Sequence, residues 1–339
     1  MKLLVVSDRS PEEDSTNFLL SELRKCINVE VINTKNKPEK TTIIDRVLHK
    51  IQIEIDKSNI NARLLEKVSE TKYDALFIMR GNRLKPDTVK QLSKKTYLVG
   101  YSGDNMCRWF NRTRNYMKGL KYYNLLFAVN VPAYKEIEKY TDAEVIYFNK
   151  CASKKIHVPK AMENENKIYD VTFIGTYEKE RACALYNLAR KGIRIEVWGN
   201  NWTKNIYTHA NLKIRYTDIV GHEYATVLRK SKIVIGFLRK ANGDTQTSRS
   251  FEITACGTFA LLERTDEHLQ LYREGVEIEC FESDDELQEK IIYYLSDEIS
   301  REKIANCGYL RVVQSEYYFD SLAKNILINI RSRTKNVRK

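Results

Sequence analysis

The sequence is poor in the residues that break regular structure and in the patterns that build metal or disulfide sites. Only 5 Pro and 13 Gly occur among 339 residues, which excludes a collagen-like chain, and 42% hydrophobic residues exclude a mostly disordered one. The seven cysteines are far apart with no Cys-x-x-Cys pair, and the five histidines are equally scattered. We therefore expect reduced, packed thiols and no structural zinc.

The sequence also has no long apolar run, and we expect no signal peptide from the pattern of its first residues. No stretch approaches the ~18–20 apolar residues that a membrane-spanning helix needs, and residues 2–7 read as a strand rather than as part of a signal peptide. These features predict a cytoplasmic protein without a transmembrane segment. A Gly-x-Gly-x-x-Gly segment after a strand is absent too, which argues against a nicotinamide-dependent enzyme.

What the chain does have is length and positive charge. At 339 residues it exceeds the ~100–200 residues of one ordinary domain and suits two. Its 57 Lys and Arg against 45 Asp and Glu leave a net charge of +12. Such a surplus fits attraction to nucleic acid, anionic lipid or phosphorylated small molecules, or else a solvated lysine-rich surface.

Short apolar segments alternate with helical patterns along the chain. The first half predicts strands at residues 3–7, 29–34, 74–79, 97–102, 125–129 and 145–148, with helices at 16–26, 41–71, 86–95, 106–118 and 132–140. The second half predicts strands at 170–174, 194–198, 212–216, 232–238, 258–262 and 276–281, with helices at 178–191, 223–230, 248–256, 301–306 and 312–330 and one opening in a Ser283–Glu286 capping box. Continuous apolar strands of this kind belong to parallel sheets covered on both faces.

The alternation predicts an α/β protein of two Rossmann-like, doubly wound domains facing a cleft. We place the domains at residues 1–155 and 165–310, on either side of a polar, charged stretch. The apolar stripe of helix 311–330 is expected to pack back on the N-terminal domain. The tail 331–339 carries five basic residues and no acid, so it is either a solvated end or a weak contact to an anionic surface.

Two segments have the chemistry of a ligand site. After strand 170–174, Gly175 and Thr176 lead into a helix that carries Arg181, an arrangement that suits phosphate but also occurs in ordinary α/β turns. In the second segment, Asp244 and Glu252 are eight residues apart, so both are expected to reach the same edge of the sheet. A carboxylate there can accept hydrogen bonds from vicinal sugar hydroxyls, or the two can be a loop acid and a solvated helix Glu.

The second half of the chain resembles a known enzyme family. The segment Arg249–Phe259 (RSFEITACGTF) with residues 269–278 and 281–287 resembles the C-terminal signature of CgeB-like, group-1 glycosyltransferases. The resemblance extends upstream through 173–175, Arg181 and 197–202, and downstream through 291–295 and 301–308. In the first half it is looser, at 73–78 and at 103–105, where Gly-Asp-Asn stands for an Asp-Asp pair.

The resemblance implies a GT-B fold, with an acceptor-side N-terminal domain and a donor-side C-terminal domain. It implies that Asp244 contacts the donor sugar, that Glu252 holds the ribose, and that Asp104 touches or deprotonates the acceptor, unless Asp104 only caps the next helix. Asp8 is a weaker candidate. The residues implied to bind the donor nucleotide sugar are Gly175, Thr176, Arg181, Gly199, Trp202, Ser248, Arg249, Glu252 and Gly257.

The resemblance further implies a retaining glycosyltransferase that moves a sugar from a nucleotide-diphosphate sugar, without a bound cofactor or a required metal, to a glycan, glycoconjugate or protein in the cytoplasm. The absence of an Asp-x-Asp at a plausible donor site agrees with metal independence. Two alternatives stay open. One is a phage-type glycosyltransferase that modifies DNA, and the other is a non-catalytic binder of sugar nucleotides, which the Asp244 and Asn105 departures allow.

Overall fold

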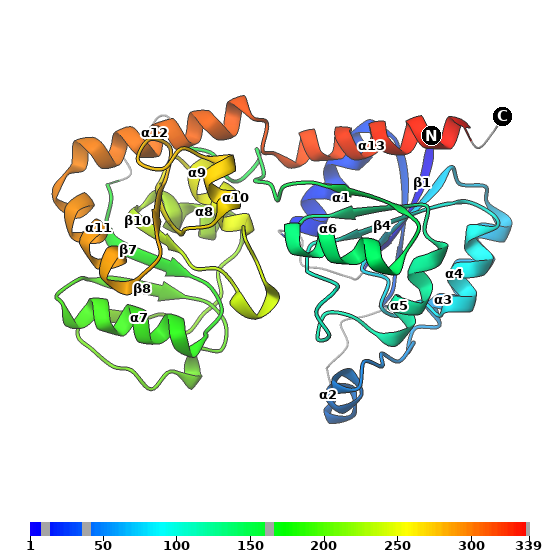
Figure 1. Cartoon of the computed structure of the whole chain (residues 1–339), viewed down its shortest axis with the longest axis horizontal. Coiled ribbons are helices and arrows are strands. Elements are labelled where there is room, and N and C mark those ends of the chain that lie inside the picture. The colour runs from blue at the N-terminus through cyan, green and yellow to red at the C-terminus, as the bar shows by residue number, and fades with distance from the viewer. Residues whose placement is uncertain (8–13, 36–41, 160–165, 337–339) are drawn as a thin grey trace. The chain divides into compact units, whose positions relative to one another are not determined.

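The computed structural model describes residues 1–7, 14–35, 42–159 and 166–336, and Asp8 lies outside them (Figure 1). The chain divides into two compact units. Unit 1 consists of Met1–Asn149, Lys240–Asp244 and Asp320–Lys339, and unit 2 of Lys150–Arg239 and Thr245–Phe319. This division does not test the domain limits predicted at residues 1–155 and 165–310 or the linker between them, which stay predictions.

Unit 1 is built on a six-stranded parallel sheet with the strand order β2-β1-β3-β4-β5-β6. The strands are β1 (Lys2–Ser7), β2 (Asn28–Asn33), β3 (Ala75–Met79), β4 (Tyr97–Ser102), β5 (Leu125–Ala128) and β6 (Glu144–Tyr147). The helices are α1 (Ser15–Cys26), α2 (Ile43–Lys50), α3 (Ile60–Glu70), α4 (Pro86–Ser93), α5 (Arg114–Gly119), α6 (Val131–Ile137) and α13 (Phe319–Asn336). Buried aliphatic side chains of the strands, α3 and α4 form its core.

Unit 2 contains a second six-stranded parallel sheet, with the order β12-β11-β10-β7-β8-β9. The strands are β7 (Tyr169–Ile174), β8 (Ile195–Trp198), β9 (Leu212–Ile214), β10 (Ser231–Gly236), β11 (Phe259–Glu263) and β12 (Glu279–Phe281). The helices are α7 (Lys179–Arg190), α8 (Gly221–Arg229), α9 (Ser248–Ala255), α10 (Asp266–Leu271), α11 (Asp284–Ser296) and α12 (Glu298–Gln314). Counted from its own first strand, this unit has the order 3-2-1-4-5-6 that dinucleotide-binding folds use.

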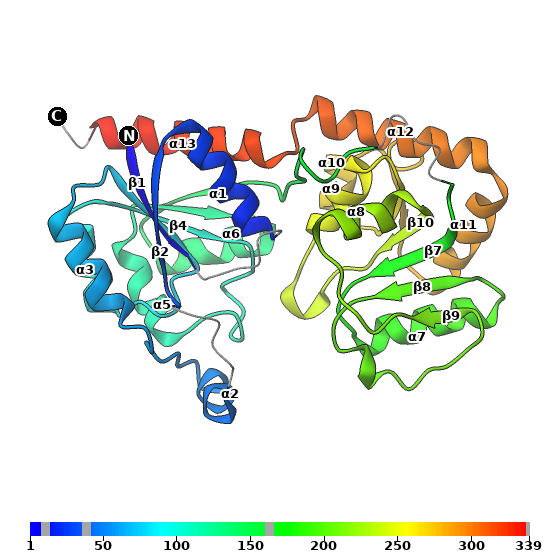
Figure 2. The ribbon, with the colours of Figure 1, turned by 180° about the vertical axis from the view of Figure 1, so that it is seen from behind.

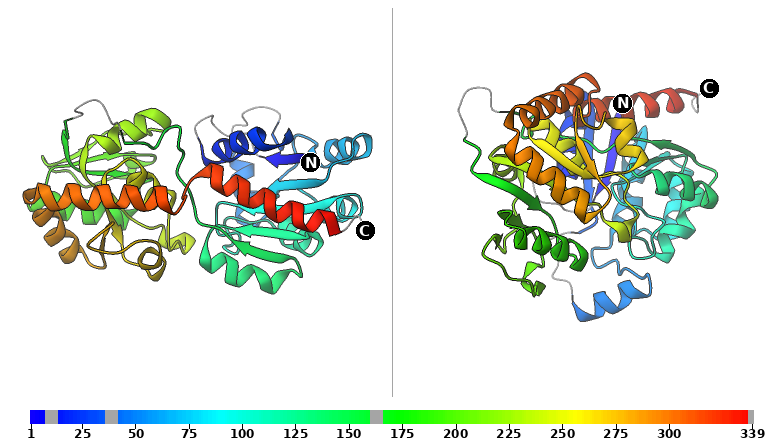
Figure 3. Two further views of the ribbon diagram at one scale, coloured as in Figure 1. Left: turned by 90° about the horizontal axis from the view of Figure 1, so that it is seen from above. Right: turned by 60° about the vertical axis from the view of Figure 1, so that its left-hand side comes forward.

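The predicted fold class is confirmed, and all twelve predicted strands are present. The C-terminal helix also packs as predicted. Its residues Leu322, Ala323, Ile326, Leu327 and Ile330 are buried, as is Tyr318 directly before the helix, and Arg333 pairs with Glu144 at the start of β6. Figure 3 shows α13 lying along unit 1.

Four predicted helices are wrong in extent, one of them the helix predicted at 312–330, which begins only at Phe319. The segment 41–71 is two helices, because Gln52 and Asn59 adopt positive φ angles and the Asp56 carboxylate accepts the Ile60 amide hydrogen (2.8 Å) at the start of α3. The helix predicted at 106–118 begins only at Arg114, after the N-cap Thr113. The predicted helix at 301–306 is part of the longer α12, which extends through Val312.

Of the two hydrogen bonds in the predicted Ser283–Glu286 capping box, one is present and the other has a different donor. Its hydroxyl accepts the Glu286 amide hydrogen (3.2 Å), but the Glu286 carboxylate reaches back to the amide of Glu282 (2.8 Å) rather than to that of Ser283.

Helix α2 is unusual because none of its residues is buried. It stands away from the rest of unit 1 in Figure 2 and in the right-hand view of Figure 3. Polar contacts hold it: Lys57 pairs with Asp45 (2.7 Å), and the His49 Nε2 atom lies 2.9 Å from the Phe110 carbonyl oxygen.

Candidate active site

The sheet of unit 2 has a topological switch point between β7 and β10. These neighbouring strands are the first and fourth of the unit, so the chain leaves them toward opposite sides. Ligands of doubly wound folds bind beyond the carboxyl ends of strands at such a point. Gly175 follows β7 here, and Phe237 and Leu238 follow β10.

Arg181 joins the ends of these two strands. From the first turn of α7, its guanidinium donates to the Thr176 carbonyl oxygen (Nη1, 3.2 Å) and to the Leu238 carbonyl oxygen (Nη2, 2.8 Å). Its side chain is only 10% exposed, and burial lowers its pKa. The Nε atom is buried and has no hydrogen-bond partner among the described residues.

Arg249 reaches the same turn from α9. Its Nε atom donates to the Ile174 carbonyl oxygen, the last residue of β7. The two guanidiniums are close enough for the charge of Arg249 to lower the Arg181 pKa, while Glu178 acts in the opposite direction. Two cations therefore meet at the switch point, where they can bind an anion, although Arg181 also pairs with Glu178 (3.4 Å).

Glu252 lies one turn further along α9. Its Oε2 atom accepts a hydrogen bond from the buried hydroxyl of Tyr224 on α8 (2.9 Å). The Tyr224 ring packs edge-on against His157, with ring centroids 5.8 Å apart. The Glu252 carboxylate is half-buried, and Oε1 has no partner within the described residues, so one oxygen stays free to accept from a ligand.

The loop before α9 is held by residues that the sequence analysis missed. Glu267, at the start of α10, accepts from Gln246 (2.8 Å) and from the Thr245 hydroxyl. His268 lies within hydrogen-bond distance of the Ser250 hydroxyl (2.8 Å) and of the Glu263 carbonyl oxygen (2.8 Å). The only signal in the sequence is that these residues begin a helix directly after a strand, which most α/β units share.

Several residues implied by the resemblance have structural roles in unit 2. Trp202 is 1% exposed, and its Nε1 atom donates to the Gly175 carbonyl oxygen (2.8 Å), so the indole is not available to a ligand. Gly199 has φ +136°, and a Cβ atom there would lie 2.1 Å from the same oxygen. Gly257 has φ +66° and follows α9 at the end opposite to Ser248.

Asp104, in unit 1, follows β4 and does not cap the next helix. Its carboxylate pairs with Arg80 (2.7 Å), while Thr113 caps α5. Arg80 follows β3 with φ +65°. Both residues line a cavity of about 400 Å³ that is also bordered by the polar side of α2.

Asp244 has its contacts in unit 1, with which the segment Lys240–Asp244 is grouped. Its Oδ1 atom accepts from the Nδ2 atoms of Asn130 (3.1 Å) and Asn242 (2.5 Å). Glu252 has its contact in unit 2. The spacing of eight residues therefore does not, by itself, place the two carboxylates on one scaffold.

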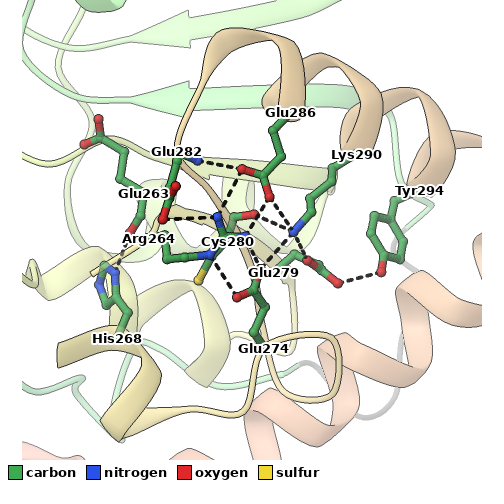
Figure 4. Close-up of polar contacts among 10 residues, drawn as sticks. All are labelled: Glu263, Arg264, His268, Glu274, Glu279, Cys280, Glu282, Glu286, Lys290 and Tyr294. Atoms are coloured by element: carbon green, nitrogen blue, oxygen red, sulfur yellow. Dashed lines mark hydrogen bonds and ion pairs between the residues drawn. The ribbon is translucent and has the colours of Figure 1, made fainter. Parts of the chain in front are cut away.

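A larger polar network lies at the carboxyl end of β11 (Figure 4). Arg264 binds Glu274 (2.5 Å) and Glu286 (2.6 Å), and Lys290 binds Glu279 (2.6 Å). The paired Arg264 guanidinium lowers the pKa of Glu286 to about 2. Both cations of this network are neutralised within unit 2, so we assign it to holding β11, β12 and α11 together.

Within the described ranges, no group of three or more His, Cys, Asp or Glu side chains could hold a metal ion. Metal independence stays a prediction. No helix in the described part of the chain combines the length and the apolar character needed to cross a bilayer.

The two sheets and their strand orders define an α/β protein of the GT-B class. Residues 181–328 match the family described as glycosyl transferase-like. A search of curated proteins finds no match. The family match confirms the predicted glycosyltransferase, while the CgeB-like assignment stays a prediction.

Solved structures with the same fold match nearly the whole chain. Sucrose-phosphate synthase from Thermosynechococcus elongatus is 9% identical with a TM-score of 0.71, covering 99% of this chain and 100% of that one. Anabaena HepE in complex with UDP is 11% identical with a TM-score of 0.65 (98% and 100% covered). An alpha-glucosyltransferase in complex with UDP and a 13-mer DNA is 13% identical with a TM-score of 0.65 (97% and 99% covered). At these identities the likeness shows the fold alone.

Proposed function

We propose that the protein is a retaining, CgeB-like glycosyltransferase that uses a nucleotide-diphosphate sugar, with UDP as the first nucleotide to test. The observation that carries the proposal is the meeting of Arg181 and Arg249 at the β7–β10 switch point. A diphosphate has the charge and the geometry to bind two guanidiniums, and helix α9 begins beside it. HepE and the alpha-glucosyltransferase, which share the fold, were solved with UDP.

In the proposed reaction, the bond between the sugar C1 atom and the diphosphate oxygen breaks and a bond from C1 to an acceptor oxygen forms. Negative charge grows on the leaving diphosphate, and Arg181 and Arg249 stabilise it. Glu252 accepts from the ribose hydroxyls with its free oxygen, and Asp244 contacts the donor sugar. The acceptor loses a proton, for which the Asp104 carboxylate is the proposed recipient. No step needs a cofactor or a metal.

The remaining predicted donor residues fall into two groups, those proposed to lie next to the donor and those proposed to act through the fold. Thr176 and Ser248 lie beside the two arginines, so their backbone and hydroxyl groups are proposed to contact the phosphates. Gly175 and Gly199 are proposed to shape the turn that the donor meets. Trp202 and Gly257 act through the fold rather than through direct contact.

Thermal shift with UDP, GDP and ADP and their glucose conjugates tests the proposal, together with slow hydrolysis of the donor in the absence of acceptor. We expect one nucleotide series to stabilise the protein and the stabilisation to fall in Arg249→Met and Glu252→Ala. If no nucleotide raises the melting temperature, the protein is not a nucleotide-sugar enzyme. Binding without turnover across glycan, protein and DNA acceptors would favour a non-catalytic binder.

DNA is the second candidate acceptor. The net charge of +12 favours a polyanion, and one protein of the same fold was solved with DNA. Duplex binding that weakens steeply with salt, and sugar transfer to a hydroxylated base, would support it. If the affinity for duplex matches that for an unrelated polyanion such as heparin and no transfer occurs, the acceptor is a glycan, glycoconjugate or protein.

A further inference from the structure

Helix α2 has an apolar face that no part of the described chain covers. Ile43 (77% exposed), Val47 (55%) and Ile51 (47%) follow one another four residues apart along one side of the helix, and Ile44 (66%) lies next to them. A folded protein seldom leaves so many aliphatic side chains together in water. An eight-residue helix is also too short to persist without contacts, yet α2 is capped and tied down.

The other side of α2 has a use. Asp45 and His49 line the cavity that contains Asp104, and each makes a polar contact described above. The helix is therefore oriented, with its polar side toward unit 1 and its apolar side outward. The cavity explains why the polar side of α2 faces unit 1, but it does not explain why the outward side is apolar.

One border of the apolar face carries positive charge. Arg46 and Lys50 form the row next to Ile43 and Val47 and are exposed. Aliphatic residues with a basic edge are typical of helices that lie in a membrane interface.

We propose that unit 1 docks on an anionic lipid bilayer through α2, with its apolar face in the acyl boundary and Lys50 at the headgroups. A second copy of the chain fits less well, because a symmetric contact would bring the same cations of two chains of charge +12 together. Duplex DNA would neutralise the cations but leave Ile43, Ile44 and Val47 in water. This docking goes beyond the proposed transfer reaction and does not depend on it.

Co-sedimentation of the full chain with phosphatidylcholine vesicles, with and without 30 mol% phosphatidylglycerol, tests the docking. We expect binding to the anionic vesicles that weakens with salt. Replacing Ile43 and Val47 together by Ser lowers the partition coefficient by at least about tenfold, and Lys50→Ala lowers it about fivefold. The matched control is Ile299→Ser in unit 2, at an equally exposed isoleucine (83%), which leaves it unchanged.

UDP-induced thermal shift on the same variants separates this proposal from the proposed function, because α2 does not contribute to the donor site. Vesicle binding without a nucleotide response would overturn only the function, and a nucleotide response without vesicle binding would overturn only the docking. The docking is also wrong if Ile299→Ser weakens binding as much as the α2 changes do. Dimerisation or duplex binding that depends on Ile43 and Val47, in the absence of vesicle binding, overturns it in favour of those partners.

Discussion

The role proposed for Glu252 can be tested by a change that leaves its surroundings intact. In Glu252→Gln the side chain keeps its length, and the amide oxygen can still accept the Tyr224 hydroxyl hydrogen that the carboxylate accepts at 2.9 Å. The change removes the charge and turns the free acceptor oxygen into a donor. Because Tyr224 stays paired, we expect the free energy of unfolding to change by less than about 1 kcal/mol.

The expected loss appears in nucleotide binding. A hydrogen bond to a charged group contributes about 1.5–3 kcal/mol, so UDP affinity should fall by about 10–150-fold. Calorimetric titration with UDP and with 2′,3′-dideoxy-UDP isolates the ribose contact, since the second ligand lacks both hydroxyls. The variant should bind the dideoxy nucleotide about as well as the unaltered protein does.

The two ligands also define what would refute the reasoning. An equal loss for UDP and the dideoxy nucleotide would mean that Glu252 acts on the phosphates or on the fold. No loss for either would remove Glu252 from the donor site. Tyr224→Phe serves as the control, because it keeps the carboxylate but removes its anchor, and we expect a smaller loss of UDP affinity than in Glu252→Gln.

Three further predictions concern stability, measured by urea denaturation. Burial lowers the pKa of His268 below its ordinary value of 6.5, so on acidification the unfolded chain binds this proton at a higher pH than the folded protein does. The free energy of unfolding that His268 contributes is therefore fully present above pH 6.5 and falls below it by up to about 1.4 kcal/mol per pH unit. His268→Gln should reduce this slope. Gly199→Ala should cost more than about 3 kcal/mol because the added Cβ would lie 2.1 Å from an oxygen, whereas Gly103→Ala, with no atom within 4 Å, should be neutral. Arg264→Met should cost about 2–3 kcal/mol by leaving two carboxylates short of a cation, while Arg194→Met, at a 75%-exposed arginine, should cost less than about 1 kcal/mol.

The strands were predictable because a doubly covered parallel sheet requires continuous apolar segments, and these are visible without any partner. Phe77 and Phe259, for instance, are in fully buried runs. Helix limits were less predictable, because a single left-handed residue ends a helix without changing the hydrophobic pattern. Gln52 and Asn59 adopt that conformation between α2 and α3, and nothing in their identity requires it.

The positions of the proposed donor-side residues in the fold were predictable, because strand ends indicate where a ligand can approach a parallel sheet. The strand before Gly175 indicated where a phosphate could approach, and Arg181 does reach that turn. Trp202 was misplaced because a motif shows which residues recur together but not whether they face a ligand or each other. Glu267 and His268 were missed because their partners, Gln246 in the loop before α9 and Ser250 in its first turn, are 21 and 18 residues away in the chain.

The charges at the β7–β10 switch point are a stronger argument for an anionic ligand there than the family resemblance is. Burial and the charges of Arg249 and Arg239 lower the pKa of Arg181 there, while the carboxylates of Glu178 and Glu263 act in the opposite direction. A buried cation beside other cations is costly, and the cost shows in the lowered pKa of Arg181 and in its unpaired Nε atom. Packing alone does not require it, since an aliphatic side chain could fill the same space. A doubly charged anion would offset the repulsion of the two converging arginines at once, and this is why we place the diphosphate, rather than the sugar or the base, at the end of β7.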